Sequence, residues 1–164
     1  MSKTGGEALV ESIKAKGVEV VFGIPGVQLY HLMDAFYKHP EIKFIVTRHE
    51  QGAAYMADGY ARASGKEGVC VVVPGPGLLN ASAAIGTAYS ASSPVLVLTG
   101  QINKDYIGLE TGELHEIHEQ LDVMKPITKS AERVVDASQI EAAVERAFYQ
   151  LRTGRPRPVE IEVP

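Results

Sequence analysis

The sequence predicts an α/β fold of three layers, in which helices flank a mostly parallel central sheet of about six strands. Two observations lead to this prediction. Short runs of Val, Ile and Leu alternate along the 164 residues with longer segments of helical periodicity. The runs at 69–73 and 95–98 contain no charged residue, as is typical of strands that are buried on both faces of a parallel sheet.

The elements follow in order along the chain. The first predicted helix, 7–15, has Thr4 as its N-terminal cap and ends at Gly17. The predicted strands are short runs rich in β-branched residues, at 18–22, 42–46, 69–73, 95–98, 134–135 and 159–163. The remaining helices are predicted at 28–37, 51–63, 78–90, 115–124 and 138–151, and a loop at 104–111. No repeat or linker interrupts this pattern, so we expect residues 1–164 to form a single domain.

Composition excludes several classes of function. The net charge is −4 and no basic cluster occurs, so we expect no nucleic-acid partner. The single Cys70 lies in an apolar run and is expected to be a buried, inert thiol. The sequence contains neither a signal-peptide pattern nor an apolar stretch of membrane-spanning length. We therefore expect no membrane association and a cytoplasmic setting.

The most informative segment is Arg48-His49-Glu50, which stands between the predicted strand 42–46 and a helix rich in small residues. This position directs the Glu50 carboxylate outward from the end of a sheet. Open α/β folds bind ligands at the carboxyl ends of their parallel strands. An acidic residue at this place could also serve only to complement the helix dipole, and the residues alone leave both interpretations open.

Three of the predicted strands are followed by loops that contain glycine and, in two cases, proline. Glycine lets the backbone approach a ligand without obstruction, and proline stiffens the approach, although tight turns between strand and helix need the same residues. The loops cover residues 22–26, 73–80 and 99–101. Three such loops beside an outward-facing carboxylate favour a ligand site.

A dinucleotide-binding fold is the alternative that these loops suggest. Gly75-Pro76-Gly77-Leu78-Leu79-Asn80 follows a strand and opens a helix, but Asn80 stands where the fingerprint requires its third glycine. The next strand ends in Leu98-Thr99-Gly100-Gln101 without the acidic residue that would bind a ribose. We therefore reject NAD binding.

Taken together, these motifs resemble the pyrimidine-binding (PYR) domain of thiamine diphosphate enzymes, in the superfamily of acetolactate synthase, pyruvate oxidase and the 2-oxoacid decarboxylases. The resemblance runs from Thr4 to Pro164 and so covers nearly the whole chain. Its motifs are Val21-Phe22-Gly23-Ile24-Pro25-Gly26, Arg48-His49-Glu50, Ala57-Asp58-Gly59-Tyr60-Ala61-Arg62, Gly75-Pro76-Gly77 and the segment from Pro94 to Gln101. It implies one half of the cofactor site of an enzyme that decarboxylates or ligates a 2-oxoacid-type substrate, as a lyase or a transferase.

The resemblance makes Glu50 the catalytic glutamate, whose carboxyl hydrogen-bonds N1′ of the cofactor's aminopyrimidine and so favours loss of the proton from C2 of the thiazolium. It implies six further cofactor-binding residues, namely Ile24, Pro25, Gly26, Val73, Pro76 and Asn80. The first three match a loop along the aminopyrimidine ring, the next two line the ring, and the last is a polar neighbour of it. From the residues alone, Asn80 could instead simply open a helix.

The segment 113–122 resembles a region that often carries a Phe-Gln-Glu motif in the family, but its register is ambiguous. Glu116, Glu119 or Gln120 could stand in the place of the family's glutamine. His115 and His118 lie three residues apart and could face the same way on a helix. Three interpretations of this segment are open: a surface helix, a substrate-facing histidine or a metal-binding pair. We assign no metal ligand to this chain.

The family's diphosphate-binding (PP) domain holds Mg²⁺ and the cofactor's diphosphate through a Gly-Asp-Gly…Asn signature, which this sequence lacks. We therefore expect the chain to be inactive alone and to share thiamine diphosphate with a PP domain of the same longer polypeptide or of a partner subunit. The resemblance also implies a homodimer through PYR domains. Three alternatives remain for what the chain is: an excised N-terminal domain, a natural small subunit as in two-subunit sulfopyruvate decarboxylases, or a non-catalytic PYR-like binding module.

Overall fold

A computed structural model describes residues 3–164, in which six parallel strands form one sheet of order β2-β1-β3-β4-β6-β5. The strands are β1 (Val20–Gly23), β2 (Lys43–Val46), β3 (Gly68–Val72), β4 (Val95–Gly100), β5 (Ser130–Arg133) and β6 (Val159–Val163). The α-helices are α1 (Gly5–Ala15), α2 (Tyr30–Lys38), α3 (Glu50–Ser64), α4 (Pro76–Ala91), α5 (Gln120–Met124) and α6 (Ile140–Arg152). Short 3₁₀ turns occupy Val27–Leu29, Lys125–Ile127 and Ala137–Gln139. The three-layer α/β fold that the sequence predicts is confirmed.

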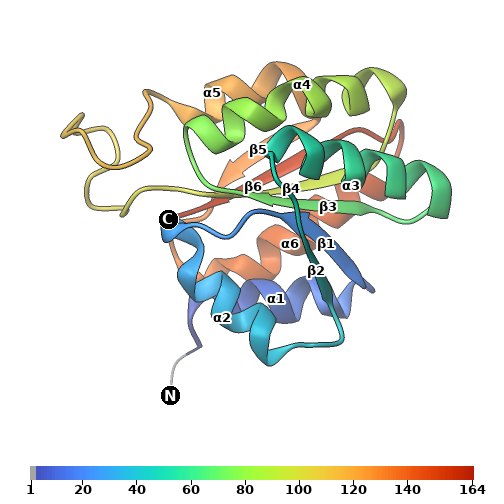
Figure 1. The fold of residues 1–164 in the computed structure, drawn as a ribbon, viewed down its shortest axis with the longest axis horizontal. Helices are drawn as coiled ribbons and strands as arrows, with labels where there is room; N and C mark the ends of the chain where they lie inside the picture. The colour runs from blue at the N-terminus through green and yellow to red at the C-terminus, as the bar shows by residue number, and fades with distance from the viewer. Residues whose placement is uncertain (1–2) are drawn as a thin grey trace.

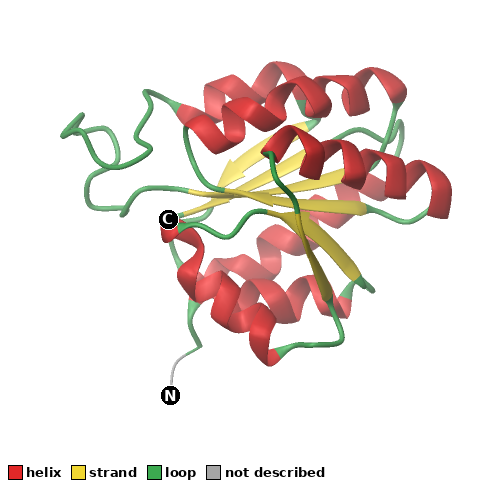
Figure 2. Cartoon of the chain, viewed as in Figure 1, coloured by secondary structure: helices red, strands yellow, loops and turns green. Residues whose placement is uncertain are grey.

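The helices divide between the two faces of the sheet, with α1, α2 and α6 below it and α3, α4 and α5 above it in Figures 1 and 2. Alternate residues of the central strands enter the two cores, as the pleat requires. Val71 and Leu98 pack against the lower helices, while Cys70 and Val97 pack against the upper ones. Cys70 is fully buried, as the sequence predicts, and burial raises the pKa of its thiol to about 12, which disfavours the reactive thiolate.

Several helix ends follow from local sequence. Thr4 caps α1 in a reciprocal capping box with Glu7. Gly65 ends α3 in the left-handed conformation, with φ of 72°. Pro76 is the first residue of α4, where its missing N–H costs no helical hydrogen bond. These caps confirm the predicted starts and stops to within about two residues.

Two expectations about the elements are wrong. The strand expected at 134–135 lies at Ser130–Arg133, where an edge strand pairs with β6 without an apolar run of its own. The helix expected at 115–124 begins only at Gln120, because the residue before it, Glu119, has a φ of 43°. The strand β2, which was expected at 42–46, forms the other edge of the sheet, and its last residue, Val46, is 63% exposed.

The described part of the chain, residues 3–164, contains no helix that is both long enough and apolar enough to cross a membrane. The segment between β4 and α5 is the longest without a helix or a strand, as the loop expected at 104–111 suggested. It projects beyond the carboxyl end of the sheet, on the left of Figure 1.

Candidate functional site

The chain reverses its direction across the sheet between β1 and β3. These strands are neighbours, yet β1 leads through α2 to β2 on one side, while β3 leads through α4 to β4 on the other. The loops that leave β1 and β3 therefore depart toward opposite faces at the same edge. Such a switch point leaves a crevice at the carboxyl ends of the strands, which is the usual ligand site of open α/β sheets.

Glu50 is the first residue of α3 and stands at this edge. The residue before it caps the helix, because Nδ1 of His49 accepts a hydrogen bond of 3.1 Å from the backbone N–H of Gln51. The Glu50 side chain is half-buried, and its Oε2 accepts a hydrogen bond of 2.9 Å from Nδ2 of Asn80 on α4. The N-terminal end of the helix further favours the carboxylate charge. Asn80 lies one turn inside α4, so it does not open that helix.

The Val73 side chain lies between two glycines of the candidate site. A Cβ added to Gly26 would lie 2.2 Å from Cγ1 of Val73, and a Cβ added to Gly77 would lie 2.6 Å from Cγ2 of Val73. The same Cβ on Gly77 would lie 3.8 Å from Cγ of Glu50. Glycine at both places is therefore needed for the loop after β1, the loop after β3 and the start of α3 to meet around Val73.

These contacts bring together most of the residues that the sequence singled out. Glu50 and Asn80 are hydrogen-bonded, and Gly26 and Val73 are in contact. Ile24 and Pro25 precede Gly26 in the same loop; Ile24 is half-buried and Pro25 is exposed. Pro76 is exposed at the first position of α4.

The motif residues Asp58 and Arg62 lie away from this edge. Asp58 is eight residues beyond Glu50 in α3, which places it about 12 Å further along the helix axis. Its buried carboxylate pairs with Arg62, whose Nε also donates to Oγ of Ser93. This part of the motif ties α3 to the chain that enters β4, so its role is structural.

The segment 113–119 contacts the site at Gly75 and at Gln28. His115 has a φ of 68°, and its carbonyl oxygen lies where a Cβ on Gly75 would stand, 2.2 Å away. Its Nδ1 lies 3.0 Å from Oε1 of Gln28, and Nε2 of Gln28 donates to the carbonyl of Leu114 at 2.8 Å. The segment is thus bound to the loops after both β1 and β3, a connection that the sequence did not indicate.

His115 and His118 do not form a pair. His118 is exposed and its Nδ1 contacts Glu110, whereas His115 contacts Gln28. No group of three or more His, Cys, Asp or Glu side chains within residues 3–164 could hold a metal ion.

Gln120 overturns the interpretation of this region as a surface helix. It is fully buried, and its amide bonds the backbone of Gly75 and Gly100 together with the carboxylate of Glu162. Periodicity could not reveal it, because α5 has only five residues. Glu160 and Glu162, two fully buried carboxyls on β6, were likewise not among the predicted site residues.

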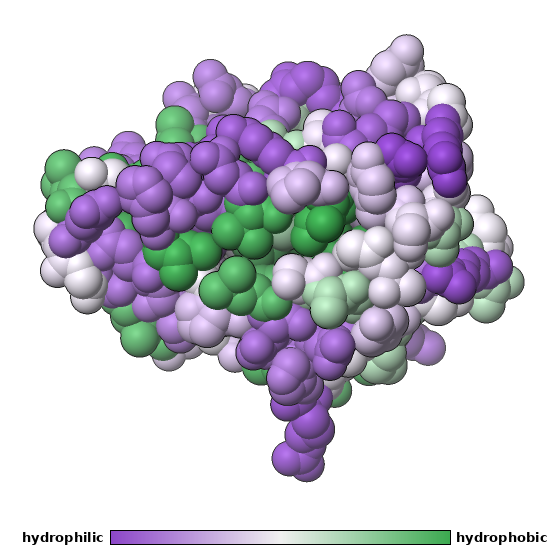
Figure 3. Space-filling model, turned by 90° about the horizontal axis from the view of Figure 1, so that it is seen from above, coloured by the Kyte–Doolittle hydropathy of each residue, from purple (hydrophilic) through white to green (hydrophobic). Residues whose placement is uncertain are grey.

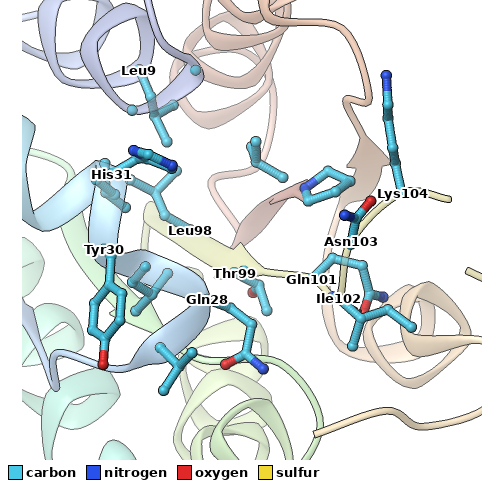
Figure 4. A pocket seen from close by; sticks show the side chains of 18 of the residues that line it. Leu9, Gln28, Tyr30, His31, Leu98, Thr99, Gln101, Ile102, Asn103 and Lys104 are labelled. Carbon is cyan, nitrogen blue, oxygen red and sulfur yellow. Dashed lines mark hydrogen bonds between the residues drawn. The ribbon is translucent and has the colours of Figure 1, made fainter. Parts of the chain in front are cut away.

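A cavity of about 600 Å³ lies beside this site without containing Glu50, Val73 or Asn80. It opens on the side of α1 and α2, and it shares the Val27–Leu29 turn with the candidate site. Figure 4 shows Gln28, Tyr30 and His31 on one side of this cavity and Gln101, Ile102, Asn103 and Lys104 on the other.

The fold and the site define an α/β domain that presents one carboxylate, held by an asparagine, at a topological switch point. The family described as thiamine pyrophosphate enzyme, N-terminal TPP binding domain, matches residues 3–125. The chain belongs to this family, as its motifs predicted.

Curated relatives cover nearly all of the chain. A probable 2-ketoarginine decarboxylase AruI of Pseudomonas aeruginosa is 43% identical over 163 residues, which are 98% of this chain and 29% of that protein. The acetolactate synthase large subunit of Lactococcus lactis is 41% identical over 161 residues, 98% of this chain and 28% of its own length. A probable acetolactate synthase large subunit of Methanocaldococcus jannaschii is 43% identical over 160 residues, 98% and 26% respectively. The chain thus spans somewhat more than a quarter of the length of these relatives.

Proposed function

We propose that residues 1–164 form a single PYR domain that binds the aminopyrimidine of thiamine diphosphate at the switch point between β1 and β3, with Glu50 as its catalytic residue. The observation that carries this proposal is the hydrogen bond of 2.9 Å from Asn80 to the Glu50 carboxylate, beside the contacts of Val73 with Gly26 and Gly77. These contacts put a carboxylate acceptor next to the apolar side chain of Val73.

The chemistry of these residues fits an aminopyrimidine. A flat heteroaromatic ring needs apolar walls together with a few polar groups that fix its orientation. Val73 and the loop Ile24-Pro25-Gly26 supply the walls, and Pro76 adds an exposed apolar ring at the start of α4. Glu50 and Asn80 supply the polar groups.

In this site Glu50 holds and moves a proton at N1′ of the aminopyrimidine, and Asn80 fixes the direction of the Glu50 carboxylate. Half-burial of Glu50 limits the access of water to that proton. When bound, the cofactor would supply a nucleophilic carbon for a 2-oxoacid-type substrate. The chain's own contribution is therefore binding, orientation and one proton transfer.

The other half of the site comes from a PP domain, of the same longer polypeptide or of a partner subunit, which holds Mg²⁺ and the diphosphate. The assembled enzyme, meaning this chain together with that PP domain, is then a lyase or a transferase of the acetolactate synthase-like or decarboxylase-like kind. The names of the relatives support this range of reactions.

We also propose a homodimer through PYR domains. The small residues of α3 fall into two sets. Ala53, Ala54 and Ala57 are buried against the protein's own core. The outward face instead presents Gly52, Tyr55, Met56 and Gly59 at helical spacing, with open space beside both glycines. Figure 3, which views the side of α3 and α4, shows hydrophobic side chains gathered in the middle of a polar surface. A second copy of the chain would cover this face.

The test is binding of thiamine diphosphate with Mg²⁺, measured by calorimetry on the chain alone and on the assembled enzyme. We expect binding only in the assembled enzyme, and we expect Val73→Asp to abolish it because a charge would replace an apolar wall. Val135→Asp is the matched control, since Val135 is 52% exposed and lines the neighbouring cavity, which contains none of Glu50, Val73 and Asn80. Equal binding by wild type and Val73→Asp, with both folded by circular dichroism, would refute the proposal.

A further inference from the structure

The side-chain amide of Gln120 uses all of its donors at the point where three strands end. Its Oε1 accepts a hydrogen bond of 2.7 Å from the backbone N–H of Gly75. Its Nε2 donates to the carbonyl of Gly100 at 3.1 Å and to Oε2 of Glu162 at 3.0 Å. The residue is fully buried, so water cannot take the place of any of these partners if a hydrogen bond is lost.

The partners of Gln120 permit only one orientation of its amide. The carbonyl of Gly100 and the carboxylate of Glu162 can only accept, so they require Nε2 on their side and leave Oε1 to the N–H of Gly75. Glu162 is itself held by Arg133, whose Nε donates to its Oε1, and by Gln101, whose Nε2 donates to the same oxygen at 3.1 Å. Figure 4 shows Gln101 just beyond the end of β4.

Gly75 is the point at which this network reaches the candidate site. It has a φ of 55°, which only glycine adopts readily, and the carbonyl of His115 leaves no room for a Cβ. The buried hydrogen bond from Gly75 to Gln120 therefore ties the backbone between Val73 and Gly77 to α5, in addition to the turn's own backbone bonds from Gly77 to Pro74 and from Leu79 to Gly75. Those two residues form the contact beside Glu50.

We propose that Gln120 is a positioning residue. It fixes the position of the 73–77 loop relative to the ends of β4 and β6, and through this loop it fixes the position of Val73 against the cofactor ring. Glu162 and Arg133 support it by fixing the direction of its amide. The inference rests on the proposed function for the cofactor, but the network itself is a property of this chain.

The first experiment measures hydrogen exchange at the Gly75 amide by NMR in the purified chain. Gln120→Met keeps the length of the side chain and removes all three hydrogen bonds. We expect exchange at Gly75 to rise at least tenfold, while the amide of Leu98 in the core of β4 changes little. Thr128→Val is the matched control: the buried Thr128 hydroxyl donates to the carbonyl of Met124 at 2.8 Å, so its loss should leave Gly75 unchanged.

Gln120→Glu gives a readout that a merely structural role would not produce. Its carboxyl would face Glu162, with Glu160 two residues away on the same strand and Arg133 beyond Glu162. When protonated it can still donate to Glu162 and accept from Gly75, and when ionised it repels Glu162. Protection of the Gly75 amide should therefore become dependent on pH, lost as the new carboxyl ionises, whereas the wild-type amide has no proton to lose.

The second experiment measures the Kd of thiamine diphosphate with Mg²⁺ in the assembled enzyme, where Gln120→Met should raise it at least tenfold and Thr128→Val should not. Unchanged exchange at Gly75, an equal rise at every amide, or faster exchange at Gly75 with an unchanged Kd would each overturn the positioning role. If the wild-type assembled enzyme fails to bind the cofactor, the proposed function is wrong, and the exchange result at Gly75 still decides whether the network positions the loop.

Discussion

The Asn80 side chain donates a hydrogen bond of 2.9 Å to the Glu50 carboxylate, although the two residues belong to different helices. Both helices begin at the carboxyl edge of the sheet, so their N-terminal ends approach one carboxylate together. The bond links α3 and α4 directly at the site where we propose that the cofactor binds.

We expect Glu50→Gln to leave the free energy of unfolding within about 0.5 kcal/mol of wild type, because the side chain is half-buried and an amide can still accept from Asn80. In the assembled enzyme the change should slow hydrogen–deuterium exchange at C2 of the cofactor about 100-fold or more, since general acid–base catalysis is lost. Glu141→Gln, on the exposed side of α6, is the control. An unchanged C2 exchange rate would remove Glu50 from its role.

Gly77→Ala should destabilise the fold by about 1–3 kcal/mol, because the new Cβ would stand 2.6 Å from Cγ2 of Val73. The cost should shrink in the Val73→Ala background, which removes both Cγ atoms, so a double-mutant cycle should show coupling. Gly86→Ala in the same helix is the control, since its nearest neighbour would lie at an ordinary 3.7 Å. Additive effects of the two changes in urea unfolding would contradict the contact.

Glu160→Gln should change how stability depends on pH. Burial, reinforced by the neighbouring Glu162, raises the pKa of the Glu160 carboxyl to about 8, and neither oxygen has a hydrogen-bond partner among residues 3–164. A carboxyl whose pKa is higher folded than unfolded binds more protons in the folded state, so its contribution to stability falls as pH rises from about 4.5 to about 8.

The slope of this loss is at most about 1.4 kcal/mol per pH unit. Thermal unfolding of Glu160→Gln should therefore show a higher Tm than wild type near pH 8 and a smaller difference near pH 5. Glu132→Gln serves as the reference, because it removes a carboxylate that is 40% exposed and paired with Arg146. Parallel pH profiles for wild type and Glu160→Gln would mean that Glu160 is not protonated in the folded chain.

Gly59→Arg should abolish self-association of the chain, because a large charged side chain would occupy the outward face of α3 where Gly59 now has open space. Gly59→Ala, which adds only a methyl group, should keep the dimer and raise helix stability by about 1 kcal/mol. Light scattering at several concentrations distinguishes the two. A wild-type chain that stays monomeric at high concentration would exclude the proposed dimer.

The residues at the site differ in how far the sequence predicted them. Glu50 follows a strand and opens a helix, which local patterns predict well, and its partner Asn80 was already a candidate. Gln120 was only one of three alternatives for a motif position, and its burial was not expected. No pattern of five residues can show that a glutamine reaches the ends of three strands.

The amino-acid sequence by itself determined the alternation of strands and helices, the caps at Thr4 and Gly65, and the family, because these depend on neighbours in the chain or on contiguous motifs. Only the tertiary structure decided that β2 and β5 are edges of the sheet, that Val73 stands between Gly26 and Gly77, and that Glu160 and Glu162 are buried together. Strand order and burial arise from contacts between segments far apart in the chain, and local propensity carries no information about those contacts.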